Sequence, residues 1–250
     1  ANATITVDLS GYTDQFALLI ENTGSDATDY ASLISNWNEL EAAGCTVVGN
    51  DLFLGEVDMT VFKVDAGWNG SEFTEEVAPG YRYGINAFSG INQALGEAAV
   101  EPEKIVIAAG TYDESAAQFV KGVEIASESA VFSNVWSFGV NSDTGRDFDM
   151  ATAEKFTVTG DLTVGQFYAE KNANVYVKID GNLTTVGSFG AKLATQVDVN
   201  GTVTVTPPQN GAAQVMVYGT MNVTGKLEST SGAMGAVLRV GDESYETKYG

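Results

Sequence analysis

Four short segments between residues 156 and 240 repeat one pattern of apolar and glycine positions. In each, an apolar residue, any residue, Gly, any residue and a second apolar residue follow one another, usually with a third apolar residue two places later. The segments are Val158–Val164, Ile179–Thr185, Val199–Val205 and Val217–Val223. Their glycines are 21, 20 and 18 residues apart. Alternation with period two predicts short strands, and a repeat near 20 residues predicts a solenoid whose units bury their apolar faces against one another.

The first 80 residues lack this repeat and predict a small acidic unit of mixed α and β structure. A helix is expected over 28–43, because its apolar residues recur at helical spacing and Gly44 can end it. Strands are expected at 3–8, 15–21, 46–48 and 57–64. This order favours a compact α+β segment over about 1–66, although part of it could instead form a decorated coil of the solenoid. A glycine-rich loop over 66–84 follows this segment. We place the domain boundary within that loop, which gives an α+β segment at 1–80 and a solenoid at 81–250.

Residues 86–114 predict the start of the solenoid. Asn86 can cap a helix over 87–99, and Ile105–Tyr112 is an apolar strand that ends in a turn. The run Ala87-Phe88-Ser89-Gly90-Ile91-Asn92-Gln93-Ala94-Leu95, followed by Ile105-Val106-Ile107-Ala108-Ala109-Gly110-Thr111-Tyr112-Asp113-Glu114, resembles the opening of the pectate-lyase-like parallel β-helix superfamily. In that superfamily a helix plugs the N-terminal end of the solenoid, and a G-T-Y-x-E turn follows the first strand.

The resemblance covers about residues 84–240 and implies a mainly β fold. The expected architecture is a right-handed parallel β-helix with an N-terminal capping helix, preceded by the small α+β segment. A cap is physically reasonable there, because an open solenoid end exposes backbone hydrogen-bonding groups and apolar side chains. The polar residues 241–250 show no cap pattern, so we expect further coils or another subunit to cover the C-terminal end.

Charge limits the partners that the chain can have. It carries 12 basic and 33 acidic residues and no His, a net charge of −21, and residues 1–80 hold a single base, Lys63. Such a surface repels nucleic acid and anionic lipid, and no apolar run is long enough for membrane insertion. Cys45 is the only cysteine, so an internal disulfide is impossible. We expect a secreted or cell-surface protein without a nucleic-acid partner.

Catalytic residues are not predicted. The resemblance implies enzymes that cleave acidic polysaccharides, either lyases with calcium-binding aspartates and an Arg or Lys base, or hydrolases with an aspartate cluster, a His and an Arg-x-Lys. The chain has no His and no Arg-x-Lys, and the outward positions of its repeats carry Thr, Asn and single Asp residues. The chain is therefore expected not to be an enzyme, with a polysaccharide lyase as the alternative.

Three sets of residues are candidates for binding. Asp143, Asp147 and Asp149 form the densest acidic loop and could hold Ca²⁺, although their spacing misses the EF-hand pattern and the alternative is a solvated loop. No other cofactor is expected. Trp68, Tyr81 and Tyr83 stand among glycines and could form a carbohydrate or partner surface, or pack as a loop. A second possible aromatic platform consists of Trp136, Phe138, Phe167 and Tyr168.

These patterns favour an extracellular structural or adhesive protein. The expected function is that of a rigid solenoid module of a surface layer, filament or adhesin, which forms a homo-oligomer or filament through the solenoid ends or binds a surface partner. The alternative is a carbohydrate-binding or polysaccharide-degrading β-helix protein, with a glycan as its ligand.

Overall fold

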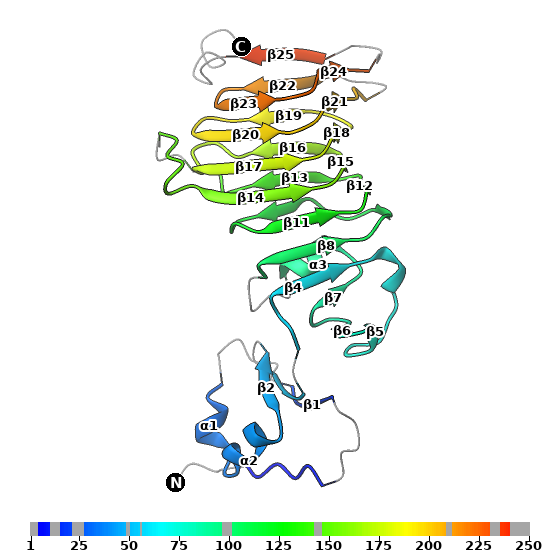
Figure 1. Ribbon diagram of the computed structural model, residues 1–250, viewed down its shortest axis with the longest axis vertical. Coiled ribbons are helices and arrows are strands. Elements are labelled where there is room, and N and C mark those ends of the chain that lie inside the picture. Colours follow the sequence, from blue (N-terminus) through cyan, green and yellow to red (C-terminus); the bar gives the residue numbers. More distant parts are fainter. Residues whose placement is uncertain are drawn as a thin grey trace.

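The computed structural model of the chain contains a parallel β-solenoid of about seven turns, which confirms the expected fold class (Figure 1). It describes residues 5–10, 16–21, 28–48, 51–55, 57–96, 102–142, 147–208, 212–230 and 236–240. Strands make up 46% of the structure and helices 9%. None of the described helices is long and apolar enough to cross a membrane.

Three large parallel sheets form the faces of the solenoid. The first face runs in the order β23 (Thr220–Val223), β20 (Thr195–Val199), β17 (Val175–Asp180), β14 (Glu154–Thr159), β11 (Glu124–Ser127), β8 (Lys104–Ile107), β4 (Val61–Val64) and β7 (Ala87–Phe88). The second face runs in the order β24 (Leu227–Ser229), β21 (Val203–Val205), β18 (Leu183–Thr185), β15 (Leu162–Val164), β12 (Ala130–Phe132) and β9 (Thr111–Tyr112). The third face runs in the order β25 (Ala236–Val240), β22 (Ala213–Val217), β19 (Phe189–Ala191), β16 (Gln166–Ala169), β13 (Val135–Phe138) and β10 (Ala117–Phe119).

The inward residues of successive coils stack in register, as the period-two alternation predicts. On the first face, one column contains Ile105, Ile125, Val158, Ile179, Val199 and Val223. On the third face, the rings of Phe167 and Phe189 stack at 5.2 Å with an angle of 8° between them. Both rings are completely buried. Each fully buried side chain of this kind contributes about 1.5–3 kcal/mol to stability, so the columns hold the coils together.

Three of the four glycines of the repeat, Gly160, Gly181 and Gly201, stand at one corner of the solenoid, between the first and second faces. A Cβ on Gly181 would lie 2.2 Å from the carbonyl oxygen of Gly160, and one on Gly201 would lie 2.2 Å from the carbonyl of Gly181. The next member of this column is Gly225, whose Cβ would lie 2.5 Å from the carbonyl of Gly201. The prediction that Gly219 continues the series was wrong, because the same apolar-x-Gly-x-apolar pattern occurs at another corner, where the chain passes from the third face to the first.

The number of residues between equivalent positions of successive coils varies because the loops at the corners differ in length. Register places Ile125 beside Val158, which follows it by 33 residues, whereas Val158 and Ile179 are 21 apart. The difference lies in the long connection between β13 and β14. Strand spacing within a sheet is fixed by hydrogen bonding, so extra residues can only leave the stack as loops.

The N-terminal end of the solenoid differs in detail from the prediction. The expected helix over 87–99 begins with strand β7, and the helix α3 covers Ile91–Gly96. Strand β4, which the sequence placed with the α+β segment, pairs in parallel with β8 and β7 and so belongs to the first face. A 3₁₀ turn, Ala66–Trp68, and an antiparallel hairpin of β5 (Glu76–Ala78) and β6 (Tyr81–Arg82) connect β4 to β7.

The preceding segment is a small antiparallel sheet with two short helices. The sheet order is β1 (Ala17–Ile20), β3 (Asp51–Leu54), β2 (Cys45–Val48), and the helices are α1 (Tyr30–Leu33) and α2 (Trp37–Ala42). The single helix expected over 28–43 is interrupted at Ile34, which pairs with Ile5 in an isolated bridge. Figure 1 shows this segment below the solenoid, joined to it by the chain after β3.

Candidate functional site

The N-terminal end of the solenoid is closed by apolar packing and a carboxylate cap. Phe88 of β7 and Ile91 and Ala94 of α3 are completely buried. The Glu114 carboxylate accepts hydrogen bonds from the backbone N–H groups of Ile91 and Asn92, both at 2.9 Å. These are donors that the first turn of a helix cannot satisfy internally, so Glu114 caps α3 from the first coil.

Tyr112, in the Gly110-Thr111-Tyr112 turn, also stabilises the N-terminal end of the solenoid. Its hydroxyl hydrogen bonds to the carbonyls of Val64, at 3.2 Å, and Ala108, at 3.0 Å. Burial, together with the nearby carboxylates of Asp65, Glu114 and Glu128, raises the pKa of Tyr112 to about 12. The Tyr and the Glu of the turn therefore both help to hold the N-terminal end of the solenoid together.

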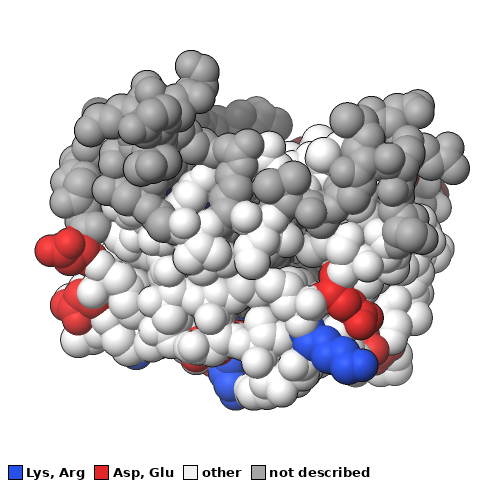
Figure 2. Space-filling model, turned by 90° about the horizontal axis from the view of Figure 1, so that it is seen from above, with Lys and Arg blue, Asp and Glu red and all other residues white. Residues whose placement is uncertain are grey.

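The C-terminal end exposes the apolar columns that the rest of the solenoid buries. Register places Leu227 on Val203, Leu238 on Val215 and Val240 on Val217. Leu227 is 42% exposed, Leu238 58% and Val240 74%, whereas Val203 is fully buried. Figure 2 looks down on this end, and the charged side chains among the described residues lie toward its rim.

Two of the three predicted aromatic surface residues meet around Lys63. Trp68 lines a cavity of about 170 Å³ on the outer side of the first face, together with Lys63, Val64, Asp65, Val106, Ala108 and Glu128. The Lys63 ammonium lies 3.9 Å from the centroid of the Tyr81 ring, a favourable cation–π arrangement. Tyr83 is directed elsewhere, and its hydroxyl lies 3.1 Å from Ser89 Oγ. Lys63 thus lines the cavity together with Trp68 and lies over the ring of Tyr81.

The second aromatic platform does not exist, because three of its members point inward. Trp136, Phe138 and Phe167 are completely buried. Adjacent residues of a strand face opposite sides of a sheet, so a strand that buries Phe167 must turn Tyr168 outward. The three buried rings are part of the apolar columns and pack in the interior of the solenoid.

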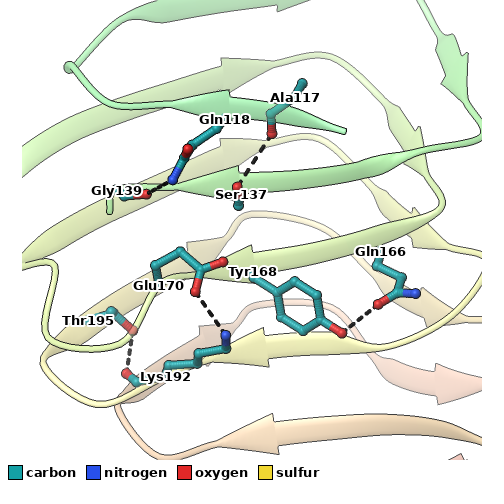
Figure 3. Close-up of polar contacts among 9 residues, drawn as sticks. All are labelled: Ala117, Gln118, Ser137, Gly139, Gln166, Tyr168, Glu170, Lys192 and Thr195. Atoms are coloured by element: carbon teal, nitrogen blue, oxygen red, sulfur yellow. Dashed lines mark hydrogen bonds and ion pairs between the residues drawn. The ribbon is translucent and has the colours of Figure 1, made fainter. Parts of the chain in front are cut away.

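Tyr168 lies on the outer side of the third face within a small polar network (Figure 3). Its hydroxyl donates to Gln166 Oε1 at 2.5 Å. The Lys192 ammonium lies 4.7 Å from the ring centroid and 2.8 Å from Glu170 Oε2. A Cβ on Gly190 of the next coil would lie 2.8 Å from the ring, so Tyr168 covers a glycine and strengthens the sheet there.

The outer side of the first face, and the corner between it and the second face, carry ladders of polar side chains that the sequence did not reveal as a network. Asp161 Oδ1 accepts from the Asn182 backbone N–H at 2.8 Å, and Asn182 Oδ1 accepts from the Thr202 N–H at 3.0 Å. Asp198 accepts hydrogen bonds from Tyr176, Gln196 and Asn222. The recurrence of Asx residues beside the repeat glycines was the available signal.

Two titratable groups of these ladders, Asp180 and Tyr176, have pKa values that are shifted away from neutrality. Hydrogen bonds from Lys178 and then from Asn200 lower the pKa of Asp180, and the Asp180 carboxylate lies 2.5 Å from the Lys178 ammonium. Burial, followed by the interaction with Asp198, raises the pKa of Tyr176 to about 12. A general acid or base at neutral pH needs a pKa near 7, and both shifts move away from it.

Only part of the predicted acidic loop lies among the described residues. Asp143 lies outside the described residues, and Asp147 is exposed. The Asp149 carboxylate accepts from the Ala151 N–H at 3.0 Å and from the Thr152 hydroxyl at 3.2 Å, within its own turn. Over the described ranges, no group of three or more His, Cys, Asp or Glu residues is placed to hold a metal ion. Calcium binding by Asp143, Asp147 and Asp149 stays a prediction.

Comparison of the chain with protein-family models, with curated proteins and with solved structures found no match. Its parallel β-helix architecture is shown by the structure, while membership of the pectate-lyase-like superfamily is a resemblance of sequence only. Function therefore has to be argued from the surfaces described above.

Proposed function

We propose that the chain is an extracellular structural module, a rigid β-solenoid that associates with its own copies through the C-terminal end. The continuous apolar columns support rigidity, since each coil is packed on the next along the whole stack. The net charge of −21 suits a protein exposed to solvent and salt. Membership of a surface layer, filament or adhesin is part of the same proposal.

The exposed last coil carries this proposal. Three sheets end there side by side, with Leu227, Leu238 and Val240 at the ends of buried columns. Sheet edges that present both unpaired backbone groups and apolar side chains pair readily with further strands. A second copy of the chain supplies both kinds of group.

Sedimentation velocity over a concentration series tests self-association. Because two chains of −21 repel each other at low ionic strength, the measurement belongs in about 0.5 M salt, where the Debye length is a few ångströms. We expect a concentration-dependent oligomer for the natural chain and a monomer for Leu227→Asp/Leu238→Asp. Val131→Asp, an exposed position on the outer side of the second face, is the matched control and should associate normally.

Two results would refute the proposal. The first is a natural chain that stays monomeric at all concentrations. The second is association that the double variant leaves intact. A chain ending at Val240 shows in addition whether residues 241–250 affect the end.

A ligand-binding function is the second candidate, and the groove at Trp68 favours it. An indole beside an ammonium and two carboxylates offers both a stacking surface and hydrogen-bonding groups, as a carbohydrate site does. Oligosaccharides should quench Trp68 fluorescence, and Trp68→Phe should remove most of that signal while Trp37→Phe, in the N-terminal segment, retains it. Glycan binding that persists in Trp68→Ala with unchanged affinity would exclude this groove.

A further inference from the structure

The two ends of the solenoid offer different surfaces to a second copy. A second copy that approached with its N-terminal end would present α3 and β7, where Ile91, Ala94 and Phe88 are already buried and Glu114 already caps the helix. Among the described residues, exposed ends of the apolar columns occur at the C-terminal end. Association through like ends is isologous, so this contact by itself closes after two subunits, and a filament or layer would need a second contact elsewhere on the dimer.

We infer that two copies join tail to tail about a twofold axis that passes beside Leu227. This inference rests on the proposed self-association and specifies its geometry. A twofold axis perpendicular to a three-faced solenoid maps one face onto its own counterpart and exchanges the other two. If β24 pairs with its own copy, β23 pairs with the partner's β25. The axis reverses strand direction, so all these pairs are antiparallel.

Charge selects β24 as the strand that pairs with itself. Lys226 and Glu228 flank Leu227, and all three are exposed. In an antiparallel pair centred on Leu227, Lys226 of each copy stands opposite Glu228 of the other, and the two Leu227 side chains meet on the inner side. Opposite charges facing each other across strands are stabilising, and like charges are destabilising.

The other two strands do not offer this complementarity. Strand β23, Thr220–Val223, contains no charged residue, and β25, Ala236–Val240, contains only Arg239. A pair of β25 strands centred on Leu238 would place Val237 opposite Arg239. Within 220–230 and 236–240 the sequence has two bases and one acid, so this coil is free of the strong acidity found elsewhere in the chain.

Charge exchange at positions 226 and 228 tests the register. Lys226→Glu puts Glu opposite Glu, and Glu228→Lys puts Lys opposite Lys, so each single variant should dimerise at least about fivefold more weakly. A 1:1 mixture of the two variants should form a heterodimer, because every facing pair is then Glu with Lys. The double variant, in which the charges are exchanged, should dimerise like the natural chain.

This pattern separates a local pairing from a general effect of net charge. Glu228→Lys lowers the repulsion between the −21 chains, so a general effect would strengthen its association, whereas facing lysines weaken it. Lys155→Glu and Glu103→Lys make the same changes of charge at exposed positions away from the end and should show only the general effect.

A cysteine at the axis provides an independent measurement. Facing residues of an antiparallel pair have Cα atoms about 4.5–5.5 Å apart, within the range that a disulfide spans. In a Cys45→Ala background, Leu227→Cys should give a covalent dimer on mild oxidation, and Val131→Cys should not. A natural chain that remains monomeric refutes the proposed function itself. A dimer that neither responds to the charge exchange nor crosslinks through position 227 refutes this geometry alone.

Discussion

Apolar columns run to both ends of the solenoid, but their last residues are buried at the N-terminal end and exposed at the C-terminal end. At the N-terminal end, Phe88 lies against Phe62, with ring centroids 5.2 Å apart, and both are completely buried. At the C-terminal end, Leu238 and Val240 are more than half exposed. The columns are equally apolar, so the difference lies in what covers them: a strand, a short helix and a carboxylate at one end, and nothing among the described residues at the other.

A similar contrast exists between the middle coils and the open end. In the middle coils, surface carboxylates such as that of Asp198 accept hydrogen bonds from neighbouring coils, and most of the aromatic rings are buried. The ends are the places where unpaired groups remain, because a stack of strands satisfies its backbone only between neighbours. The open end is therefore the surface on which the proposed association depends.

The largest expected difference between the ends is in core packing. Phe88→Ala should lower the free energy of unfolding by about 3–5 kcal/mol, because it leaves a cavity under the cap. Leu238→Ala should lower it by less than about 1 kcal/mol in the monomer, because the side chain is already exposed. Urea unfolding at low protein concentration measures both. Equal losses would show that the C-terminal end is covered in solution.

The next effect concerns alkaline pH at the capped end. The pKa of Tyr112 in the folded chain is about 12, above the usual value near 10, so folding favours the neutral phenol. Its contribution is complete below pH 10 and is lost as the pH rises to about 12, a loss of roughly 2–3 kcal/mol. Unfolding experiments at pH 9 and pH 11.5 should show this loss, and Tyr112→Phe should reduce it.

Tyr176 provides the internal comparison for that measurement. Its pKa is also raised to about 12, but it lies on the outer side of the first face, away from the cap. Tyr176→Phe should leave the alkaline loss due to Tyr112 in place. A loss that disappears in Tyr176→Phe and persists in Tyr112→Phe would contradict the assignment to the capped end.

The smallest of these effects is that of the capping carboxylate. Glu114→Ala removes the acceptor of two backbone N–H groups and should cost about 1–3 kcal/mol, and Glu114→Gln should recover part of this because it can still accept. Glu228→Gln, an exposed carboxylate at the open end, should change monomer stability by less than about 0.5 kcal/mol. If Glu114→Ala were equally neutral, α3 would not depend on this cap.

Much of the solenoid could be predicted from the sequence. Most of the wrong predictions concern local patterns that are compatible with more than one position in the fold. The alternation around Val158 and Ile179 predicted buried strands correctly. The same pattern around Gly219 was assigned to the wrong corner, because a single sequence does not distinguish one corner of a coil from another. Trp136 and Phe167 were considered as a surface, although the parity of their strands buries them.

The candidate surfaces were less accessible to prediction because they depend on contacts between distant segments. Trp68 and Tyr81 could be named from composition, but Lys63 joins them only because β4 lies in the first face. The role of Glu114 depends on the approach of the first coil to residues 23 and 22 positions earlier, Ile91 and Asn92. No local pattern encodes such an approach.

The sequence by itself determined the solenoid, its apolar columns and its acidity, because strand periodicity and charge are properties of neighbouring residues and of simple sums. Tertiary structure alone decided which glycines share a corner, which carboxylates are already satisfied, and which end of the stack is covered. Those outcomes depend on register between coils, and register is set by the packing of residues about 20 positions apart.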